Sequence, residues 1–456
     1  MNRNSAPAGR TPPGPLKSLR QFMRAPLRFF TEVSQCGDGE IVPFALLWIR
    51  CHLVVHPEDV QYILTRGAEN YSRITPDTAI FRQAVGLSLL TTEGPSWLYV
   101  RRLMHPVFSR ATISAFGDIT TSATRAMLDQ WEQRLVGLSG DQALDQVEEM
   151  RQLTLAIVAR ALFSMNSETV GLGRRIDALG AVIDKMFHSP TIVLPSLGIP
   201  LPPDLRLRSV LRQIDSELYP IIDAHIIDAR QGTGQYQDLL TLLIAARDEE
   251  GHSLSRQELR NELLDLLLAG QETTASLLMW ALSLLALHPT VEAQLHAELD
   301  VVLAGRAPTA EDLPGLPLLS SIVQESMRLY PPAWMIVRQA LKDDEVGGHR
   351  IATGSMVFLS PWVSQRHAGW WENPTQFLPE RFAPGHAPHP RGAYFPFGQG
   401  NHRCIGEQFA LMEAKLVLAT LAQRYQFRLK TGYTLSPGVF PALRPLGGLP
   451  MCFDPR

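Results

Sequence analysis

Long apolar runs, cysteines and an excess of charge of one sign are all scarce in this sequence. The 456-residue chain has only 4 cysteines and a formal net charge of −3. A nucleic-acid-binding protein would be strongly basic, and a disulfide-stabilised secreted protein would hold more cysteines for its size. No run reaches the roughly 18 apolar residues of a membrane-spanning helix. We therefore expect a cytoplasmic protein with no nucleic-acid partner and no transmembrane anchor.

The N-terminus lacks the apolar core that is typical of a signal peptide. Residues 1–15 are polar and rich in proline, which predicts a flexible arm. Basic and apolar residues are mixed over Leu16–Phe30. This stretch could touch a membrane surface, but it is more typical of a first helix interrupted at Pro26. No internal repeat or linker follows, so residues 16–456 are expected to form a single domain.

The remaining composition favours a large core, since 45% of the residues are hydrophobic and 19% are charged. Helical periodicity predicts helices within residues 97–165, 170–187, 208–248, 256–287 and 290–303. Short strands are expected before Pro57, over residues 342–362 around a Gly347-Gly348 turn, and after Phe427. The proline-rich residues 188–206 predict a loop. The expected fold class is mainly α with small β-sheets.

The segment from Phe397 to Gly406 holds one cysteine among glycines, ahead of a helix expected to continue to about Leu421. Glycines let a backbone approach a flat object closely. A cysteine at a helix N-terminus meets free N–H groups that favour the thiolate, and a thiolate is a good axial ligand for haem iron. A lone cysteine is more often a buried apolar residue. A phosphate-binding loop is a further alternative, but neither a preceding strand nor a Gly-Lys-Ser/Thr sequence supports it.

The order of residue types in this segment favours the haem ligand over both alternatives. The pattern Phe-Gly-x-Gly-x-His-x-Cys-x-Gly resembles the haem-binding loop of the cytochromes P-450. The resemblance covers about residues 30–456 and implies one large helical domain, shaped as a triangular prism, that encloses haem b. Cys404 would be the axial ligand of the iron. The neighbouring residues expected to bind the cofactor are Phe397, Gly398, His402, Ile405 and Gly406, with His402 where many members carry arginine.

A second stretch, Ala269 to Thr274, places an acid and poor helix formers inside a long apolar helix. Both features cost stability. By themselves they could reflect a surface-facing glutamate beside a helix-bending pair of threonines. The resemblance implies instead that Ala269 and Gly270 leave room for O2 over the haem. It also implies that Thr273 hydrogen-bonds the bound oxygen, while Glu272 supplies protons through water.

A third motif, Glu325-x-x-Arg328, places a carboxylate and a guanidinium on one helical face. Alone it is uninformative, since chance produces this spacing often. In the family a further arginine, here Arg381, joins the pair. The resemblance implies that the three residues have a structural role, holding the loop that presents Cys404.

A fourth group would bind the two haem propionates, which require cationic or hydrogen-bonding partners. Trp97 and Arg101 lie one turn apart on one helical face. The resemblance assigns this pair to a propionate, together with Arg338 and His402. The alternative for Arg101, and more so for Arg102, is a side chain that is simply solvated.

The resemblance implies a haem-thiolate monooxygenase that inserts one atom of O2 into an organic substrate with electrons from NAD(P)H. No flavin or iron–sulfur module is visible in the sequence, so separate partners, a ferredoxin and its reductase, are expected. They would dock near Cys404, where Arg101, Arg102 and Arg403 could supply contacts. The alternatives are a haem-thiolate enzyme of another type (oxidative coupling, isomerisation or peroxide-driven oxidation) and a non-enzymatic haem sensor.

The expected substrate is a lipophilic molecule, such as a terpenoid, a fatty acyl chain or a polyketide. One stripe of the central helix is apolar except for its threonine, and consists of Leu266, Ala269, Thr273 and Leu277. By resemblance the pocket also draws on residues 73–90, 188–206, 333–337 and 441–443. The side chains that could provide one polar anchor are Arg73, Asp77 and Arg82.

Overall fold

The computed structural model describes residues 11–36, 40–135, 143–164, 169–197, 199–202, 204–439 and 441–456. Most of the flexible arm predicted for residues 1–15 lies outside these ranges, and the first helix begins at Pro15. Helices dominate the described residues and the sheets are small, as predicted.

The helices lie in the following order. They are α1 (Pro15–Arg24), α2 (Pro26–Val33), α3 (Pro57–Leu64), α4 (Pro76–Val85), α5 (Gly94–Met104), α6 (Arg110–Ser114), α7 (Gly117–Leu135), α8 (Gln146–Phe163), α9 (Thr169–Phe187), α10 (Leu205–Gln231), α11 (Leu239–Ala245), α12 (Arg256–Leu287), α13 (Pro289–Leu303), α14 (Pro317–Leu329), α15 (Pro361–Ser364) and α16 (Glu407–Arg424). Short 3₁₀ helices are η1 (Ala68–Asn70), η2 (Pro190–Leu197), η3 (Ala310–Gly315), η4 (Pro379–Phe382) and η5 (Gly400–His402).

Four small sheets accompany them. The largest has the order β1 (Ile41–Leu46), β2 (Ile49–Val54), β8 (Met356–Leu359), β5 (Ile336–Ala340), β3 (Tyr71–Ser72), with β2 and β8 parallel and the other neighbours antiparallel. A second has the order β4 (Leu144–Asp145), β12 (Pro450–Pro455), β9 (Tyr425–Leu429). The two-stranded sheets pair β6 (Asp344–Val346) with β7 (His349–Ile351), and β10 (Pro437–Val439) with β11 (Leu443–Pro445).

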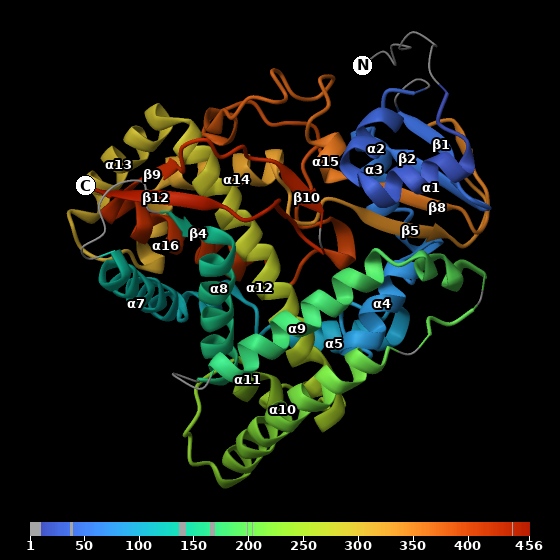
Figure 1. The fold of residues 1–456 in the computed structure, drawn as a ribbon. Helices are drawn as coiled ribbons and strands as arrows, with labels where there is room; N and C mark the ends of the chain where they lie inside the picture. The colour runs from blue at the N-terminus through green and yellow to red at the C-terminus, as the bar shows by residue number, and fades with distance from the viewer. Residues whose placement is uncertain are drawn as a thin grey trace.

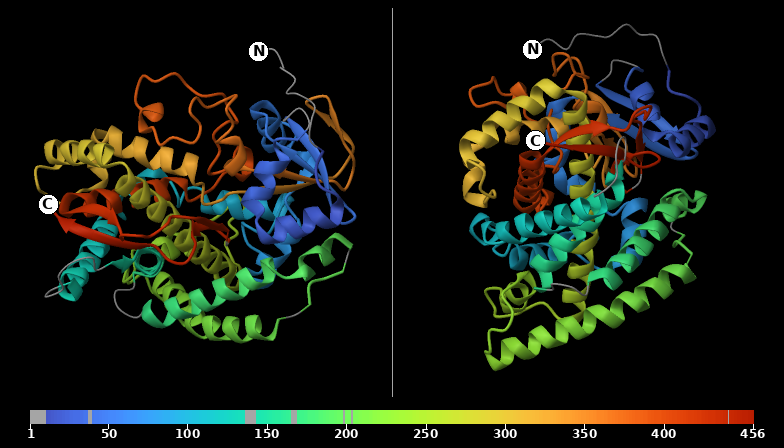
Figure 2. Two further views of the ribbon diagram at one scale, coloured as in Figure 1. Left: turned by 45° about the horizontal axis from the view of Figure 1, so that its top comes forward. Right: turned by 60° about the vertical axis from the view of Figure 1, so that its left-hand side comes forward.

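The long helix α12 runs through the middle of the molecule in every view (Figures 1 and 2). Its start is fixed by a capping box between Ser255 and Glu258. The largest sheet lies on one side with α1, α2 and α3, while α7, α13 and α16 lie on the other side (Figure 1). Helix α8 packs closely along α12, because a Cβ added at Gly270 would lie 2.9 Å from Val158 Cγ2. Helix α12 is therefore the central element against which the other parts of the site pack.

Most predicted element positions are confirmed. Helix α12 covers the predicted range 256–287, Pro26 separates α1 from α2, and Gly347-Gly348 joins β6 to β7. The helical patterns predicted over 208–248 belong to two helices, α10 and α11, because Gly232 adopts a left-handed conformation (φ 68°) and ends α10. One prediction needs correction. The loop expected over 188–206 contains η2, since proline's fixed φ is compatible with a 3₁₀ turn.

Among the described residues, no single helix has the length and apolar character needed to cross a membrane. Helices α12 and α13 reach that length and composition only together, and they meet at an angle of 108°.

Candidate functional site

A cavity of about 680 Å³ opens between α12 and the segment that precedes α16. Its lining combines the cysteine loop with side chains of α4, α5, α8, α9, β5 and β11. The following predicted site residues line it: Trp97, Arg101, Ala269, Gly270, Glu272, Thr273, Arg338, Phe397, Gly398, His402, Cys404, Ile405 and Gly406. The structure therefore brings together every residue predicted to bind the cofactor or act in catalysis.

The cysteine loop folds back on itself through backbone hydrogen bonds. The Cys404 N–H donates to Phe397 O at 3.0 Å, and the Gly398 N–H donates to Phe395 O at 3.0 Å. Gly400 has a φ of +69°, and a Cβ there would lie 2.1 Å from Leu64 O of α3. Only glycine fits this position, because the loop passes too close to α3 for any side chain.

Cys404 is exposed to the cavity but lies deep within the protein. This desolvation raises the pKa of the thiol, although the Gly406 N–H and the charge of Arg101 act in the opposite direction. The expectation of a cysteine at the start of a helix needs correction, since α16 begins only at Glu407. Burial therefore outweighs the helix N-terminus in its effect on the pKa of Cys404, and a bound cation such as a metal would favour the thiolate.

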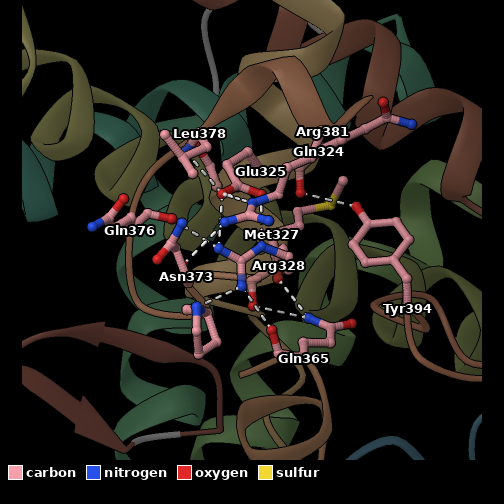
Figure 3. A network of polar contacts seen from close by, with 12 residues as sticks. Gln324, Glu325, Met327, Arg328, Gln365, Asn373, Gln376, Leu378, Arg381 and Tyr394 are labelled. Atoms are coloured by element: carbon pink, nitrogen blue, oxygen red, sulfur yellow. Dashed lines mark hydrogen bonds and ion pairs between the residues drawn. The ribbon is translucent and has the colours of Figure 1, made fainter. Parts of the chain in front are cut away.

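The predicted trio of Glu325, Arg328 and Arg381 lies together in one network of polar contacts (Figure 3). Arg328 Nε and Nη2 lie 2.6 and 2.7 Å from the two Glu325 oxygens, and both side chains are fully buried. Arg381 Nε lies 3.4 Å from Glu325 Oε1. The link to the loop passes through Gln365, which accepts a hydrogen bond from the Phe395 N–H at 3.0 Å and donates to Arg328 O at 3.1 Å.

Three arginines gather around His402 at one side of the cavity. Arg73 Nη1 lies 3.0 Å from His402 Nδ1, and the Trp97 ring lies 4.1 Å from the imidazole centroid. Burial and the charges of Arg73, Arg338 and Arg101 lower the pKa of His402 to about 3. Burial also lowers the pKa of Arg338 to about 10. This crowd of buried cations would be stabilised by an anionic ligand.

The wall formed by α12 carries the predicted Ala269–Thr274 stretch. Thr273 Oγ1 donates to Ala269 O at 2.6 Å, so the hydroxyl remains beside the cavity. Glu272 does not face solvent, as the alternative interpretation required. It lines the cavity and accepts a hydrogen bond from Arg151 Nε of α8 at 2.9 Å. Glycine is also required at position 270 by packing, because an added Cβ would lie 2.9 Å from Val158 Cγ2 of α8.

Comparison with known proteins agrees with this geometry. The family model described as Cytochrome P450 matches residues 11–437. The chain belongs to the cytochrome P450 family. As a cytochrome P450 it is 34% identical to a cyclooctat-9-en-7-ol 5-monooxygenase of Streptomyces melanosporofaciens, over 100% of this chain and 98% of that protein. It is 31% identical to a pentalenene oxygenase of Streptomyces avermitilis, over 91% of this chain and 90% of that one.

A solved structure confirms the fold. The crystal structure of the cytochrome P450DA heme domain superposes with a TM-score of 0.85 at 25% identity, covering 99% of this chain and 98% of that one. The protein is therefore a cytochrome P450 monooxygenase, and its cofactor is haem.

The cavity of this cytochrome P450 fits haem on two counts. Cys404 Sγ is open to the cavity and would hold the iron. Arg73, Arg101 and Arg338 crowd one side and would pair with two propionates. When bound, haem supplies the activation of O2.

Sequence reasoning missed several residues of this cytochrome P450 site. Arg73 is predicted only as one of three possible polar anchors for substrate, whereas the structure places it against His402 and Leu89 O at 3.0 and 3.2 Å. Gln365, Arg151 and Arg444 were not expected at all. Each contacts a motif residue from a distant part of the chain, so no local spacing could have revealed it.

Proposed function

We propose that this cytochrome P450 oxidises a terpenoid, and that its electrons come from NAD(P)H through a separate ferredoxin and ferredoxin reductase in the cytoplasm. The single observation that carries the substrate class is the apolar character of the cavity above Cys404. Its apolar lining includes Phe81, Leu89, Leu266, Leu277 and Met335. A substrate that buries carbon surface there gains the free energy of apolar transfer.

The names of the relatives support the same class. Pentalenene oxygenase and cyclooctat-9-en-7-ol 5-monooxygenase are each named for the compound that they oxidise. The second name denotes an alcohol, whose hydroxyl needs a polar partner inside an apolar cavity. This chain is similar to both over nearly its whole length.

We assign that polar partner to Asp77. Of the three side chains expected to provide an anchor, Arg73 contacts His402, and the Arg82 guanidinium hydrogen-bonds Thr91 O. Asp77 lines the cavity and accepts a hydrogen bond from Thr75 Oγ1 at 2.5 Å. Burial raises the pKa of Asp77, partly offset by Thr75 and by the charge of Arg338. The Asp77 carboxylate can also accept a hydrogen bond from a substrate hydroxyl.

In this proposal Cys404 would hold the iron, and Thr273 and Glu272 would organise protons on the α12 side of the cavity. Thr273 Oγ1 donates its single proton to Ala269 O at 2.6 Å, so its lone pairs are left to accept a hydrogen bond, and it would donate elsewhere only after releasing that bond. Ala269 leaves the helix surface open beside it. Glu325, Arg328 and Arg381 keep the Cys404 loop in register.

The absorption spectrum of the reduced, CO-bound protein tests the iron ligand. A thiolate ligand gives a strongly red-shifted Soret band, and Cys404→Ser should abolish it. A wild-type protein without this band would overturn the haem-thiolate assignment.

Spin-state titrations test the substrate class, using a cyclic terpene hydrocarbon, the matching terpene alcohol, a fatty acid and a polyketide lactone. The two terpenes should bind more tightly than the other ligands. Asp77→Asn should weaken binding of the alcohol by about 10-fold, the usual loss for a hydrogen bond to a charged group, and leave the hydrocarbon unchanged. Tighter binding of the fatty acid or the lactone would refute the terpenoid proposal.

A further inference from the structure

The Glu272 carboxylate is held by two arginines that come from elements far apart in the chain. Arg151 of α8 donates through Nε to Glu272 Oε2 at 2.9 Å. Arg444 of β11 lies with Nη1 3.5 Å from Glu272 Oε1. The two contacts are unequal, because the first is a hydrogen bond and the second is a longer ion pair. One carboxylate oxygen is therefore fixed, while the other is held more loosely.

Both arginines also interact with acids of α9. Arg151 Nη2 lies 2.7 Å from Asp177 Oδ1, which also accepts a hydrogen bond from Gln271 Nε2 at 3.2 Å. Arg444 is close enough to Asp184 to oppose the rise that burial causes in the pKa of Asp184. We refer to Arg151, Asp177, Asp184, Glu272 and Arg444 as the α12 charge cluster. All five side chains line the cavity.

Two carboxylate oxygens of this cluster lack a hydrogen-bond donor from the described residues. These are Glu272 Oε1 and Asp184 Oδ1, and both atoms are buried. Asp184 Oδ1 has only a 3.4 Å ion pair with His188 Nδ1, and Glu272 Oε1 has only the 3.5 Å pair with Arg444. Buried carboxylate oxygens require partners, which here would be water molecules admitted from the cavity that both side chains line. The cluster thus supplies acceptors for water from α9 to α12.

We propose that Arg444 is a positioning residue for Glu272, and that with Arg151 it turns the carboxylate so that Oε1 can exchange protons between water beside Asp184 and water beside Thr273. The inference rests on the proposed roles of Glu272 and Thr273. The proton balance is closed, since Glu272 gives one proton to water near Thr273 and regains one from water on the Asp184 side. Arg444 itself loses no proton.

The position of Arg444 is suited to this task. The Trp280 Nε1–H of α12 donates to Leu443 O at 2.9 Å, and Ser276 Oγ donates to the same oxygen. The residue before Arg444 is therefore fixed to the helix that carries Glu272. A guanidinium mounted in this way keeps its distance to Oε1 even while the far side of the cavity admits substrate.

A double-mutant cycle tests the proposal on the haem-loaded enzyme. Arg444→Met, Glu272→Gln and the double variant are compared for the fraction of NAD(P)H electrons that reach product rather than peroxide. Arg444→Met should lower this fraction about 10-fold, less than the roughly 100-fold that loss of a general acid costs. The double variant should match Glu272→Gln, since both changes act on one carboxylate. An additional loss in the double variant would mean that Arg444 acts elsewhere, and would overturn the proposal.

Three controls separate positioning from a damaged pocket. Arg444→Lys should restore at least half of the wild-type coupling. Arg350→Met removes an arginine of strand β7 that pairs with Asp343 at 2.8 Å on the surface, and it should behave as wild type. Product formation driven by iodosylbenzene, a single-oxygen donor that needs no protons, should be unchanged in Arg444→Met. A parallel loss with iodosylbenzene would indicate a damaged pocket and would refute positioning.

A readout independent of turnover is the infrared band of CO bound to the reduced protein. Arg444→Met and Glu272→Gln should shift this band in the same way, and Arg350→Met should not shift it. A wild-type band in Arg444→Met would overturn the proposal. Failure of the proposed function is recognised separately, since the wild-type enzyme would then show no thiolate-type CO spectrum and no coupled turnover.

Discussion

Two glutamate–arginine pairs support this site, and they differ in how completely their polar atoms are satisfied. In the Glu325–Arg328 pair all five N–H donors of the guanidinium are used, two by Glu325 and three by the backbone oxygens of Gln365, Pro374 and Gln376. In the Glu272–Arg151 pair one carboxylate oxygen has no hydrogen-bond donor.

The exposed fractions of the side chains also differ between the two pairs. The Glu325 and Arg328 side chains are both 0% exposed, whereas those of Glu272 and Arg151 are 17% and 16% exposed and line the cavity. A satisfied, dry pair can only hold its surroundings in place, which suits the support of a metal-ligand loop. An incompletely satisfied pair beside water can change its hydrogen bonds during a reaction.

The largest expected effect comes from breaking the fully buried Glu325–Arg328 pair. Glu325→Gln leaves the Arg328 charge buried without its counter-ion, and should cost about 3–5 kcal/mol in the free energy of unfolding. The Cys404 loop should loosen as well, and the purified protein should hold little haem. Denaturant unfolding and haem content measure both effects.

The matched control is Glu32→Gln, which removes the partner of Arg28 in an exposed pair of helix α2 at 2.6 Å. It should change stability by no more than about 1 kcal/mol. Equal losses in the two variants would contradict the difference drawn here.

Breaking the Glu272–Arg151 pair should affect catalysis more than the stability of the fold. Glu272→Gln should keep its haem and fold, while product formation with O2 falls by about 100-fold, the lower range for a general acid. Stopped-flow and steady-state turnover measure the rate. If Glu272→Gln lost as much stability as Glu325→Gln, the two pairs would have the same structural role and the contrast between them would be wrong.

Thr273→Ala tests the same side of the cavity with a neutral residue. Its hydroxyl hydrogen-bonds only Ala269 O within its own helix, so stability should change by less than about 1 kcal/mol. We expect O2 consumption to continue while the product yield falls about 10-fold and peroxide forms in its place, a smaller loss than the roughly 100-fold that removal of a general acid costs. Unchanged product yield would exclude Thr273 from the reaction.

A smaller effect is expected from the loss of Arg73, which belongs to neither glutamate–arginine pair. Arg73→Gln removes a cation beside His402, and should speed loss of haem to apomyoglobin by about 10-fold, the usual worth of a charged hydrogen bond. Arg82→Gln is the control on the neighbouring helix α4, since Arg82 does not line the cavity. Equal haem loss in both variants would exclude a propionate contact for Arg73.

The smallest effect belongs to Arg102, which is exposed while its neighbour Arg101 faces the cavity. Arg102→Glu should slow reduction by ferredoxin a few-fold, with a strong dependence on salt, and leave the substrate dissociation constant unchanged. Reduction at the wild-type rate would remove Arg102 from the partner surface.

The sequence predicts those parts of the site that have local patterns. The loop around Cys404 can be read from its glycines, and the limits of α12 from its apolar periodicity. The pair of Glu325 and Arg328 is readable because its members lie one helical turn apart.

The remaining parts depend on contacts between distant segments. Arg151 and Arg444 lie 121 residues before and 172 after Glu272 in the sequence (272 − 151 and 444 − 272), and only the packing of α8 and β11 against α12 brings them to it. The burial that raises the pKa of the Cys404 thiol likewise depends on the complete fold, and a nearby helix start cannot reveal it.

The attachment of β11 to α12 has a practical consequence for changing this enzyme's substrate range. Pro441 and Ala442 line the cavity, and the next residue accepts hydrogen bonds from Ser276 and Trp280. Substitutions at Pro441 or Ala442 can therefore reshape the cavity without releasing the strand. Replacing Trp280 by phenylalanine, although Trp280 does not line the cavity, would release one of the two hydrogen bonds and alter selectivity and oxygen use together.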